Sequence, residues 1–254
     1  MIPYKIIPPL QIGPFHVNMY GIMFALGAFI AIKIAAKEAR KRNAKEDVIH
    51  DIALYLLFGG IIGARLFYVL FYWPNDVSFD FFDIFKIWEG GLAFFGGIIG
   101  AIIVGYYYLR KRNLSFWAYA DIFTIPLIIG HIFGRAGDYL TGGHPGKITN
   151  LPWAIYMDNA LRHPVVLYEI IGLFAILGII YLLKKKSHFD GFLFWPYITL
   201  YSIQRLFLDI FRAESTDPKF LGLTPSQYIA LIIVAVSLYA IARFKYKKIQ
   251  TEAV

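Results

Sequence analysis

The sequence predicts an all-α integral membrane protein, a bundle of about seven transmembrane helices with a glycine-rich extracytoplasmic loop. Of its 254 residues, 58% are hydrophobic and 17% are charged, whereas soluble domains average roughly 45–50% apolar and about 25% charged residues. Apolar segments near the roughly 20 residues that a helix needs to cross a bilayer recur along the chain, separated by clusters of Lys and Arg. We therefore expect one polytopic membrane domain over residues 1–254. The Lys and Arg residues that give the net charge of +8 are assigned to loops at the membrane surface. No nucleic-acid partner is therefore expected.

Prolines, glycines and charges mark the element boundaries. Residues 1–16 contain four prolines and are expected to form an extended or interfacial lead-in. The predicted spans are about 17–36, 50–73, 91–109, 116–134, 164–183, 190–211 and 225–241. The first ends in KEARKRNAKED, and the second stops at Trp73-Pro74 before an acidic, aromatic loop. The third and fifth end in the basic runs RKR and KKK, and the seventh is followed by the basic tail RFKYKK.

The distribution of Lys and Arg predicts the orientation of these spans. One side carries 15 of them, namely Lys37, Arg40, Lys41, Arg42, Lys45, Arg110, Lys111, Arg112, Lys184, Lys185, Lys186, Arg243, Lys245, Lys247 and Lys248. The other side carries 7, namely Lys5, Lys86, Arg135, Lys147, Arg162, Arg212 and Lys219. Because cytoplasmic loops are enriched in Lys and Arg, the N-terminus is predicted outside and the C-terminus in the cytoplasm.

The stretch GHIFGRAGDYLTGGHPG, residues 130–146, contains six glycines, a Pro, two His, an Asp and an Arg in a chain that is otherwise mostly apolar. Its glycines expose backbone amides and allow positive φ angles, as a loop that closes on an anion requires. Arg135 follows an apolar run, and a cation at that depth is costly and usually functional. We interpret this stretch as the floor of a lipid-phosphate site. A glycine-rich re-entrant turn with a snorkelling Arg accounts for the same residue types.

Polar residues of five spans are predicted to gather in the outer half of the membrane. Arg65 and Arg205 lie about eight and six residues below the outer ends of their spans, or ~12 and ~9 Å. Arg135, Tyr20 and Glu169 lie near the outer ends of three other spans. An Arg at the centre of a helix costs roughly 2.5–3.5 kcal/mol on insertion scales, which favours a function for these residues. Structural pairing with carboxylates between helices is the alternative.

The sixth span carries the densest polar pattern. Its members share one helical face, at spacings i, i+4, i+8 and i+11: Tyr201, Arg205, Asp209 and Arg212. A guanidinium can bind a phosphate in a bidentate manner, and a carboxylate can hold the Arg in place. A structural ion pair at i and i+4 explains the pattern without a ligand.

The remaining candidates carry weaker signals. His131, His144 and His163 have no ligand spacing typical of a metal centre, so no metal is expected. The chain has no cysteine, so any thiol chemistry must use a thiol of the substrate. Glycines of the third span, including Gly96 and Gly97, are explained by close helix packing.

Six stretches together resemble the bacterial prolipoprotein diacylglyceryl transferases over nearly the whole chain. In order they are MYGIM at 19–23, GAR and YVLFY between 63 and 72, GGLAFFGG at 90–97, GRAGDY at 134–139, HPVVLYE at 163–169, and Arg205, Asp209 and Arg212. The corresponding family elements are a Tyr-Gly-Leu-Met opening, a second-span motif, Gly-Gly-Met-Ser-Phe-His-Gly-Gly, Gly-Arg-x-Gly-Asn-Phe, His-Pro-Ser-Gln-Leu-Tyr-Glu and Arg-x3-Glu-x2-Arg.

This resemblance implies transfer of the diacylglyceryl group of phosphatidylglycerol to the lipobox cysteine of prolipoproteins, with release of glycerol phosphate. It implies a bacterial cytoplasmic (inner) membrane protein that acts as a monomer without a cofactor, its site facing the outer leaflet. Arg135 and Arg205 would hold the phosphate, and Tyr20 and Asp209 would line the site, with Asp138 and His144 as further catalytic candidates. Substrate-binding residues are expected at Arg65, Gly96, Gly97, Gly134, His163, Tyr168, Glu169 and Arg212.

The chain departs from the family pattern at three places. Phe95 replaces the motif His that is the usual candidate for activating the thiol, Asp138 replaces an Asn, and residues 141–144 (TGGH) lack a Glu found in many members. His144, His131, Asp138 or the field of the arginines could activate the thiol instead. The alternatives to an active enzyme are a non-catalytic phosphatidylglycerol-binding homologue and a small-anion transporter. The transporter fits less well, because the inner halves of the third, fifth and seventh spans are almost wholly apolar.

Overall fold

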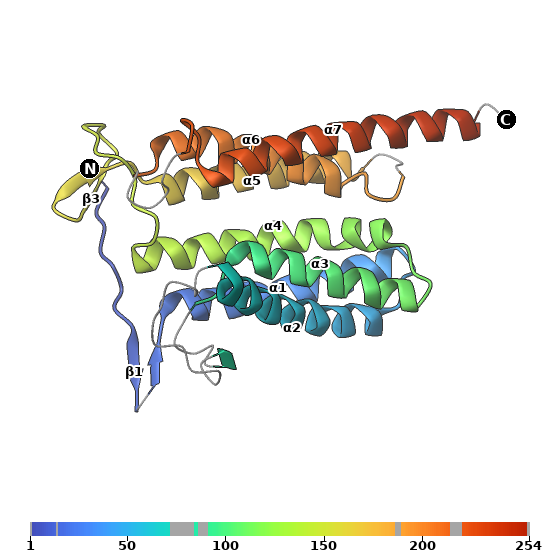
Figure 1. Ribbon diagram of the computed structural model, residues 1–254, viewed down its shortest axis with the longest axis horizontal. Coiled ribbons are helices and arrows are strands. Elements are labelled where there is room, and N and C mark those ends of the chain that lie inside the picture. Colours follow the sequence, from blue (N-terminus) through green and yellow to red (C-terminus); the bar gives the residue numbers. More distant parts are fainter. Residues whose placement is uncertain are drawn as a thin grey trace. The chain divides into compact units, whose positions relative to one another are not determined.

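The computed structural model describes residues 2–13, 15–71, 84–85, 91–185, 189–213 and 220–252. Lys86, Gly90, Lys186 and Lys219 lie outside the described residues, as does most of the acidic loop after Trp73. The helices are α1 (Met19–Lys41), α2 (Glu46–Phe71), α3 (Phe94–Lys111), α4 (Phe116–Thr141), α5 (Val165–Leu183), α6 (Phe194–Leu208) and α7 (Pro225–Glu252) (Figure 1). A 3₁₀ turn, η4 (Asp209–Phe211), follows α6.

Two short antiparallel hairpins complete the described elements. The strands β1 (Leu10–Ile12) and β2 (Phe15–Val17) pair within the predicted lead-in, with Gln11 opposite His16. The strands β3 (Ile155–Met157) and β4 (Ala160–Arg162) pair in the segment between α4 and α5. Both hairpins lie outside the long apolar helices.

The prediction of a helical integral membrane protein is confirmed. Five of the described helices are long and apolar enough to cross a membrane: α1, α2, α4, α5 and α7. The helices α3 and α6 are not among these five, so the count of seven spans stays a prediction.

The chain divides into two compact units, Met1–Ile34 with Ala120–Val254, and Ala35–Tyr119. We call them the large unit and the small unit. The prediction of a single membrane domain stays a prediction.

In the large unit, α4, α5 and α6 share an apolar core. Ile125 and Ile128 of α4 pack with Leu173, Ile176 and Ile180 of α5, together with Leu193 and Tyr197. Asp121 of α4 accepts hydrogen bonds from the backbone N–H groups of Gly191, Leu193 and Phe194, which fixes the start of α6. The helix α6 lies beside both α5 and α7 (Figure 1). This packing fixes the helix ends that carry the polar residues described below.

In the small unit, α2 and α3 pack closely through glycines. A Cβ atom on Gly63 would overlap the carbonyl oxygen of Gly96, and one on Gly96 would overlap the Cβ atom of Phe67. Small residues allow two helix backbones to approach closely. Helix packing therefore accounts for Gly96.

Candidate functional site

The segment after α4 links the ends of α4 and η4 with the start of α5. Lys147 N–H donates to the Phe211 carbonyl at 2.8 Å, and Ala213 N–H donates to that of Pro145 at 3.1 Å. His163 N–H donates to the Lys147 carbonyl at 3.0 Å. These backbone hydrogen bonds place Arg212, at the end of η4, beside side chains of α4 and α5.

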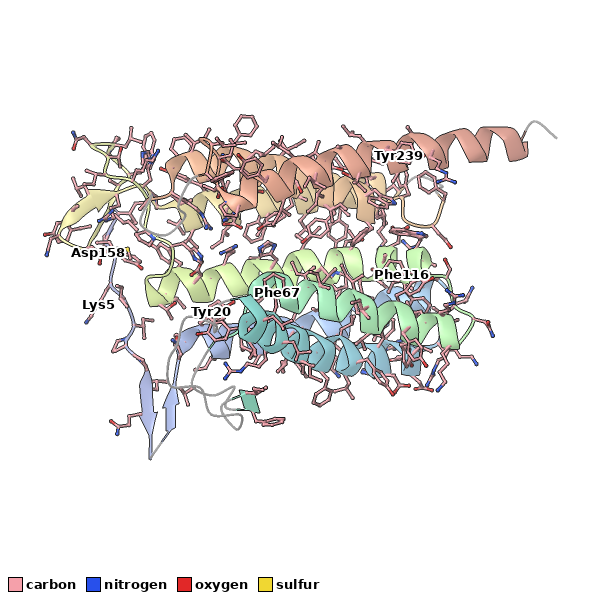
Figure 2. The ribbon with its side chains drawn as sticks, viewed as in Figure 1. Lys5, Tyr20, Phe67, Phe116, Asp158 and Tyr239 are labelled. Atoms are coloured by element: carbon pink, nitrogen blue, oxygen red, sulfur yellow. The ribbon has the colours of Figure 1, made fainter. Side chains whose placement is uncertain are left out.

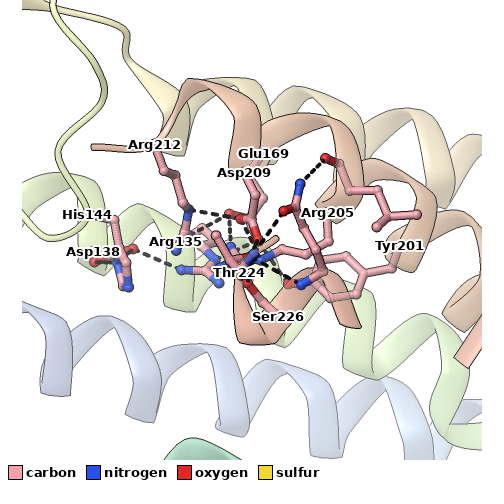
Figure 3. Close-up of polar contacts among 12 residues, drawn as sticks. Arg135, Asp138, His144, Glu169, Tyr201, Arg205, Asp209, Arg212, Thr224 and Ser226 are labelled. Carbon is pink, nitrogen blue, oxygen red and sulfur yellow. Dashed lines mark hydrogen bonds and ion pairs between the residues drawn. The ribbon is translucent and has the colours of Figure 1, made fainter. Parts of the chain in front are cut away.

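Six charged side chains meet at this point of the large unit, and we call them the arginine cluster (Figure 3). Its members are Arg135, Asp138, Glu169, Arg205, Asp209 and Arg212. Three guanidinium groups face three carboxylates, so the cluster is balanced in charge. Each of its side chains is at most 15% exposed.

Glu169 of α5 is the hub of the arginine cluster. Its Oε1 atom lies 2.9 Å from Arg135 Nε and accepts a hydrogen bond from Tyr201 Oη at 3.0 Å. Its Oε2 atom lies 3.6 Å from Arg212 Nη2 and 3.8 Å from Arg205 Nη1. One carboxylate thus touches an Arg from α4, an Arg from α6 and an Arg from the end of η4.

Asp209 joins the sixth helix to the start of the seventh. Its Oδ1 atom lies 3.1 Å from Arg205 Nε and 3.6 Å from Arg212 Nε. Its Oδ2 atom accepts a hydrogen bond from Thr224 Oγ1 at 2.8 Å and another from the Ser226 hydroxyl. The Asp209 carboxylate therefore fixes both arginines in place, as the spacing on the sixth span predicts.

Asp138 lies at the edge of the arginine cluster and bonds to a histidine. Its Oδ2 atom lies 2.9 Å from Arg135 Nη1 and 2.8 Å from His144 Nδ1. The Asp138 side chain is 7% exposed, whereas that of His144 is 41% exposed. Among the described residues whose contacts with the cluster carboxylates are given above, His144 has the most accessible side chain.

The predicted end of the fourth span at residue 134 is too early, because α4 continues to Thr141. Gly137 faces α1, where a Cβ atom would lie 3.0 Å from the Cα atom of Tyr20 and from the Cβ atom of Met23. This glycine therefore serves helix packing. Arg135 lies six residues, or ~9 Å, inside the helix instead of at its outer end.

His163 and Tyr168 form an aromatic group beside the cluster. His163 Nδ1 lies 3.3 Å from Tyr168 Oη, which accepts a hydrogen bond from Trp153 Nε1 at 2.7 Å. The rings of both residues contact Phe211 of η4. Burial lowers the pKa of His163, and the charge of Lys147 lowers it further, so the neutral imidazole is favoured.

Tyr20 and Gly134 make no direct polar contact with the arginine cluster that the described residues record. Tyr20 stands at the start of α1, where its side chain is 47% exposed and stacks on Phe24 (Figure 2). Gly134 precedes Arg135 on α4, and a Cβ atom there would meet no atom within 4 Å. Open space beside Arg135 is where a substrate group could approach.

Three predicted substrate-binding residues lie in the small unit. Arg65 is 7% exposed, and its guanidinium donates to the carbonyls of Ile84 at 2.9 Å and Gly91 at 3.0 Å. Gly96 packs against α2, and a Cβ atom on Gly97 would lie 3.4 Å from the Gly60 carbonyl oxygen. Arg65 thus fixes the backbone that leads into α3. Substrate binding by these three residues stays a prediction.

The sequence reasoning missed Thr224 and Ser226, which hold Asp209. A signal was present, because Thr-Pro-Ser-Gln at 224–227 is a capping box with proline at the first helical position. Thr224 N–H donates to Gln227 Oε1 at 3.0 Å, and Gln227 N–H donates to Thr224 Oγ1 at 3.2 Å. The Thr224 hydroxyl thus caps α7 and bonds to the cluster at the same time.

Comparison with known proteins assigns most of the chain to one family. The family model for prolipoprotein diacylglyceryl transferase matches residues 9–243. The chain belongs to this family. A Finegoldia magna relative is 38% identical over 231 residues, covering 90% of this chain and 91% of its own. A Clostridioides difficile relative is 39% identical over 214 residues (84% and 85%), and a Bacillus velezensis relative is 36% identical over 248 residues (92% and 91%). All three are named phosphatidylglycerol–prolipoprotein diacylglyceryl transferase.

The structure explains how two of the chain's departures from the family pattern fit together. A Cβ atom on Gly143 would overlap Oδ1 of Asp138, so this carboxylate takes up the room that a side chain at position 143 needs. Position 138 has Asp where the family has Asn, and residues 141–144 lack the family Glu. These two departures are therefore compatible with each other. Phe95 lies within α3, and its side chain lies outside the described part of the structure.

Proposed function

We propose that this chain transfers the sn-1,2-diacylglyceryl group of phosphatidylglycerol to the lipobox cysteine of prolipoproteins, releasing glycerol phosphate. Membership of the family and the names of the relatives support this activity. The observation that carries the proposal is the arginine cluster, where three buried guanidinium groups meet at the ends of apolar helices. Such a site suits the phosphodiester of a lipid whose acyl chains remain in the bilayer.

Arg135 and Arg205 are the residues proposed to hold the phosphodiester. Each guanidinium has five N–H donors in a rigid, planar arrangement that matches two phosphate oxygens. The thiolate attacks the carbon of the diacylglyceryl group that is bonded to the phosphate. As the bond from that carbon to the phosphate oxygen breaks, negative charge grows on the phosphate. Arginines that already face this position lower the barrier, because the carboxylates Glu169 and Asp209 have oriented them in advance.

The remaining predicted site residues of the large unit are proposed to border the same position. Gly134 leaves space beside Arg135, and Tyr20 stands where α1 approaches α4 at Gly137. Arg212 adds a third cation, while His163 and Tyr168 shape the wall beside η4. Arg65, Gly96 and Gly97, which belong to the small unit, are proposed as further substrate-binding residues.

We further propose seven membrane spans in the bacterial inner membrane, with the arginine cluster in the outer half and the protein acting as a monomer. The helix α3 has 18 residues and α6 with η4 has 18, so each is ~27 Å long, close to the roughly 30 Å of a bilayer core. Lys184, which caps the end of α5, lies 15 positions after Glu169, or ~22 Å along the helix. The cluster therefore lies at the opposite end of α5 from the basic residues that favour the cytoplasmic side.

A turnover assay tests the proposed activity. The purified protein in detergent is incubated with phosphatidylglycerol and a lipobox peptide, and the peptide mass and the release of glycerol phosphate are both measured. A mass gain of one diacylglyceryl group is expected, with a large loss of rate in Arg135→Lys, which keeps the charge but not the bidentate geometry. Lipid binding without any transfer would instead identify a phosphatidylglycerol-binding homologue.

A further inference from the structure

Asp138 and His144 form a hydrogen-bonded pair at the border of the arginine cluster. His144 Nδ1 lies 2.8 Å from Oδ2 and 3.0 Å from Oδ1 of the Asp138 carboxylate. Because an ionised carboxylate only accepts hydrogen bonds, Nδ1 must carry the proton. In the neutral form of this tautomer the lone pair is on the other ring nitrogen, Nε2, of a side chain that is 41% exposed.

The turn after α4 is built to hold His144 over Asp138. Gly142 has φ +76° and His144 has φ +53°, both in the left-handed region, which non-glycine residues seldom adopt. Gly143 N–H donates to the Asp138 carbonyl at 3.0 Å, so the chain folds back at the end of the helix. A side chain at position 143 would overlap the Asp138 carboxylate. The left-handed backbone at Gly142 and His144 and the lack of a side chain at Gly143 thus all allow His144 to contact Asp138.

The pair is coupled to the proposed phosphate site through a shared oxygen atom. Asp138 Oδ2 contacts both His144 Nδ1 and Arg135 Nη1, at 2.8 and 2.9 Å. The arginine cluster is balanced in charge, so a bound phosphodiester adds one negative charge without a partner. An imidazolium at His144, next to Asp138, would provide the matching positive charge.

We propose that His144 is the general base that activates the substrate thiol, with Asp138 as its positioning residue; this rests on the proposed transferase function. His144 Nε2 takes the proton from the lipobox cysteine. The resulting thiolate attacks the carbon of the diacylglyceryl group that is bonded to the phosphate oxygen of phosphatidylglycerol. A C–S bond forms as the C–O bond to phosphate breaks, and the electron pair of that bond leaves with glycerol phosphate. The imidazolium then returns its proton to the phosphate monoester or to water.

Other titratable groups near the site are less suited to this task. His131 is 20% exposed at its side chain, faces Glu169 Oε1 at 3.7 Å and packs edge-on against Tyr201. His163, Tyr4 and Tyr139 line the same small pocket as His144, which has a volume of about 10 Å³, room for about one water molecule. His163 Nδ1 faces the Tyr168 hydroxyl and has no carboxylate partner among the described residues. Among the described histidines near the arginine cluster, only His144 combines an accessible ring nitrogen with a carboxylate that fixes its tautomer.

The test compares two nucleophiles in His144→Asn, a substitution that tolerates the left-handed backbone and can still donate a hydrogen bond to Asp138. The lipobox peptide carries either cysteine or selenocysteine, whose more acidic selenol ionises at neutral pH without a base. A free thiol has a pKa of about 8.5, so removing its base should slow transfer to the cysteine peptide by about 10²-fold or more. Transfer to the selenocysteine peptide should fall less than about tenfold. Asp138→Asn should show the same selectivity with a smaller loss.

Each outcome distinguishes this proposal from the proposed function. His50→Asn, an exposed histidine of α2, is the matched control and should keep the rate of the unaltered protein. If the unaltered protein modifies neither peptide, the transferase function is wrong. If the unaltered protein modifies both peptides, two results would show that His144 is not the base. Either His144→Asn keeps the full transfer rate with the cysteine peptide, or its transfer rates with the two peptides fall by the same factor. In His144→Gly, added imidazole should restore part of the rate with the cysteine peptide.

Discussion

Replacing Glu169 with Gln removes one charge from the centre of the arginine cluster while it keeps the shape of the side chain. The Glu169 carboxylate is 1% exposed and lies 2.9, 3.6 and 3.8 Å from nitrogens of Arg135, Arg212 and Arg205. In Glu169→Gln, three buried guanidinium groups would face only Asp209 and Asp138. The cluster would then carry an excess of one positive charge.

The size of the effect follows from the burial of these groups. Removing one partner of a buried ion pair typically lowers the free energy of unfolding by about 3–5 kcal/mol. For a domain of this size, 1 kcal/mol corresponds to about 2–4 °C in Tm. We therefore expect the Tm of Glu169→Gln in detergent to fall by about 6–20 °C, measured by intrinsic tryptophan fluorescence during heating.

Glu46→Gln is the matched control for this experiment. The Glu46–Arg40 ion pair has a similar distance, 2.9 Å, but its side chains are 36% and 66% exposed. An exposed pair contributes about 0–1 kcal/mol, so the Tm should fall by no more than about 4 °C. Because the variant cluster carries an excess positive charge, phosphatidylglycerol should raise the Tm of Glu169→Gln more than phosphatidylcholine does. Equal Tm changes in the two variants would refute the assignment of Glu169 as the hub.

Three further predictions follow from individual contacts. Gly134→Ala should raise the stability of α4 by up to about 1 kcal/mol in thermal unfolding, yet lower the transfer rate; an unchanged rate would show that no substrate approaches there. Thr224→Val should lower the free energy of unfolding by about 2–4 kcal/mol, since α7 loses its cap and buried Asp209 loses a donor; Thr224→Ser should stay near the original value. The pKa of His163 is lowered from its ordinary 6.5 by burial and then Lys147, so the unfolded chain binds more protons just below pH 6.5 and stability should decrease as pH falls through that range. His163→Asn should flatten this dependence in Tm measurements across pH 5–8, and an unchanged slope would contradict the assignment.

The sequence predicts the polar face of the sixth helix well, because the spacing of Arg205, Asp209 and Arg212 places them on one side of a helix. The predicted depths in the membrane indicate that these residues lie near Arg135 and Glu169, but they do not predict which side chains pair. The pairings themselves depend on backbone hydrogen bonds between the segment after α4 and η4, such as Lys147 N–H to the Phe211 carbonyl. No periodicity in the sequence encodes those contacts.

The glycine-rich stretch shows why the fourth span is predicted to end too early, at residue 134. Each glycine weakens a helix by about 1 kcal/mol relative to alanine, so a stretch with several glycines reads as a break. Packing overrides this propensity, because Gly137 allows α1 to approach α4 at Tyr20 and Met23. The loop begins only at Gly142, whose φ of +76° suits a glycine. The candidate base, His144, lies in this short remaining loop.

The most direct test of the account follows both products of one reaction. The unaltered protein is mixed with phosphatidylglycerol and a lipobox peptide, and the diacylglyceryl peptide and glycerol phosphate are quantified together over time. The account predicts that the two products appear at the same rate and in equal amounts, and that both are lost in Arg135→Ala. Bound lipid with neither product formed, or glycerol phosphate released without modified peptide, would contradict it.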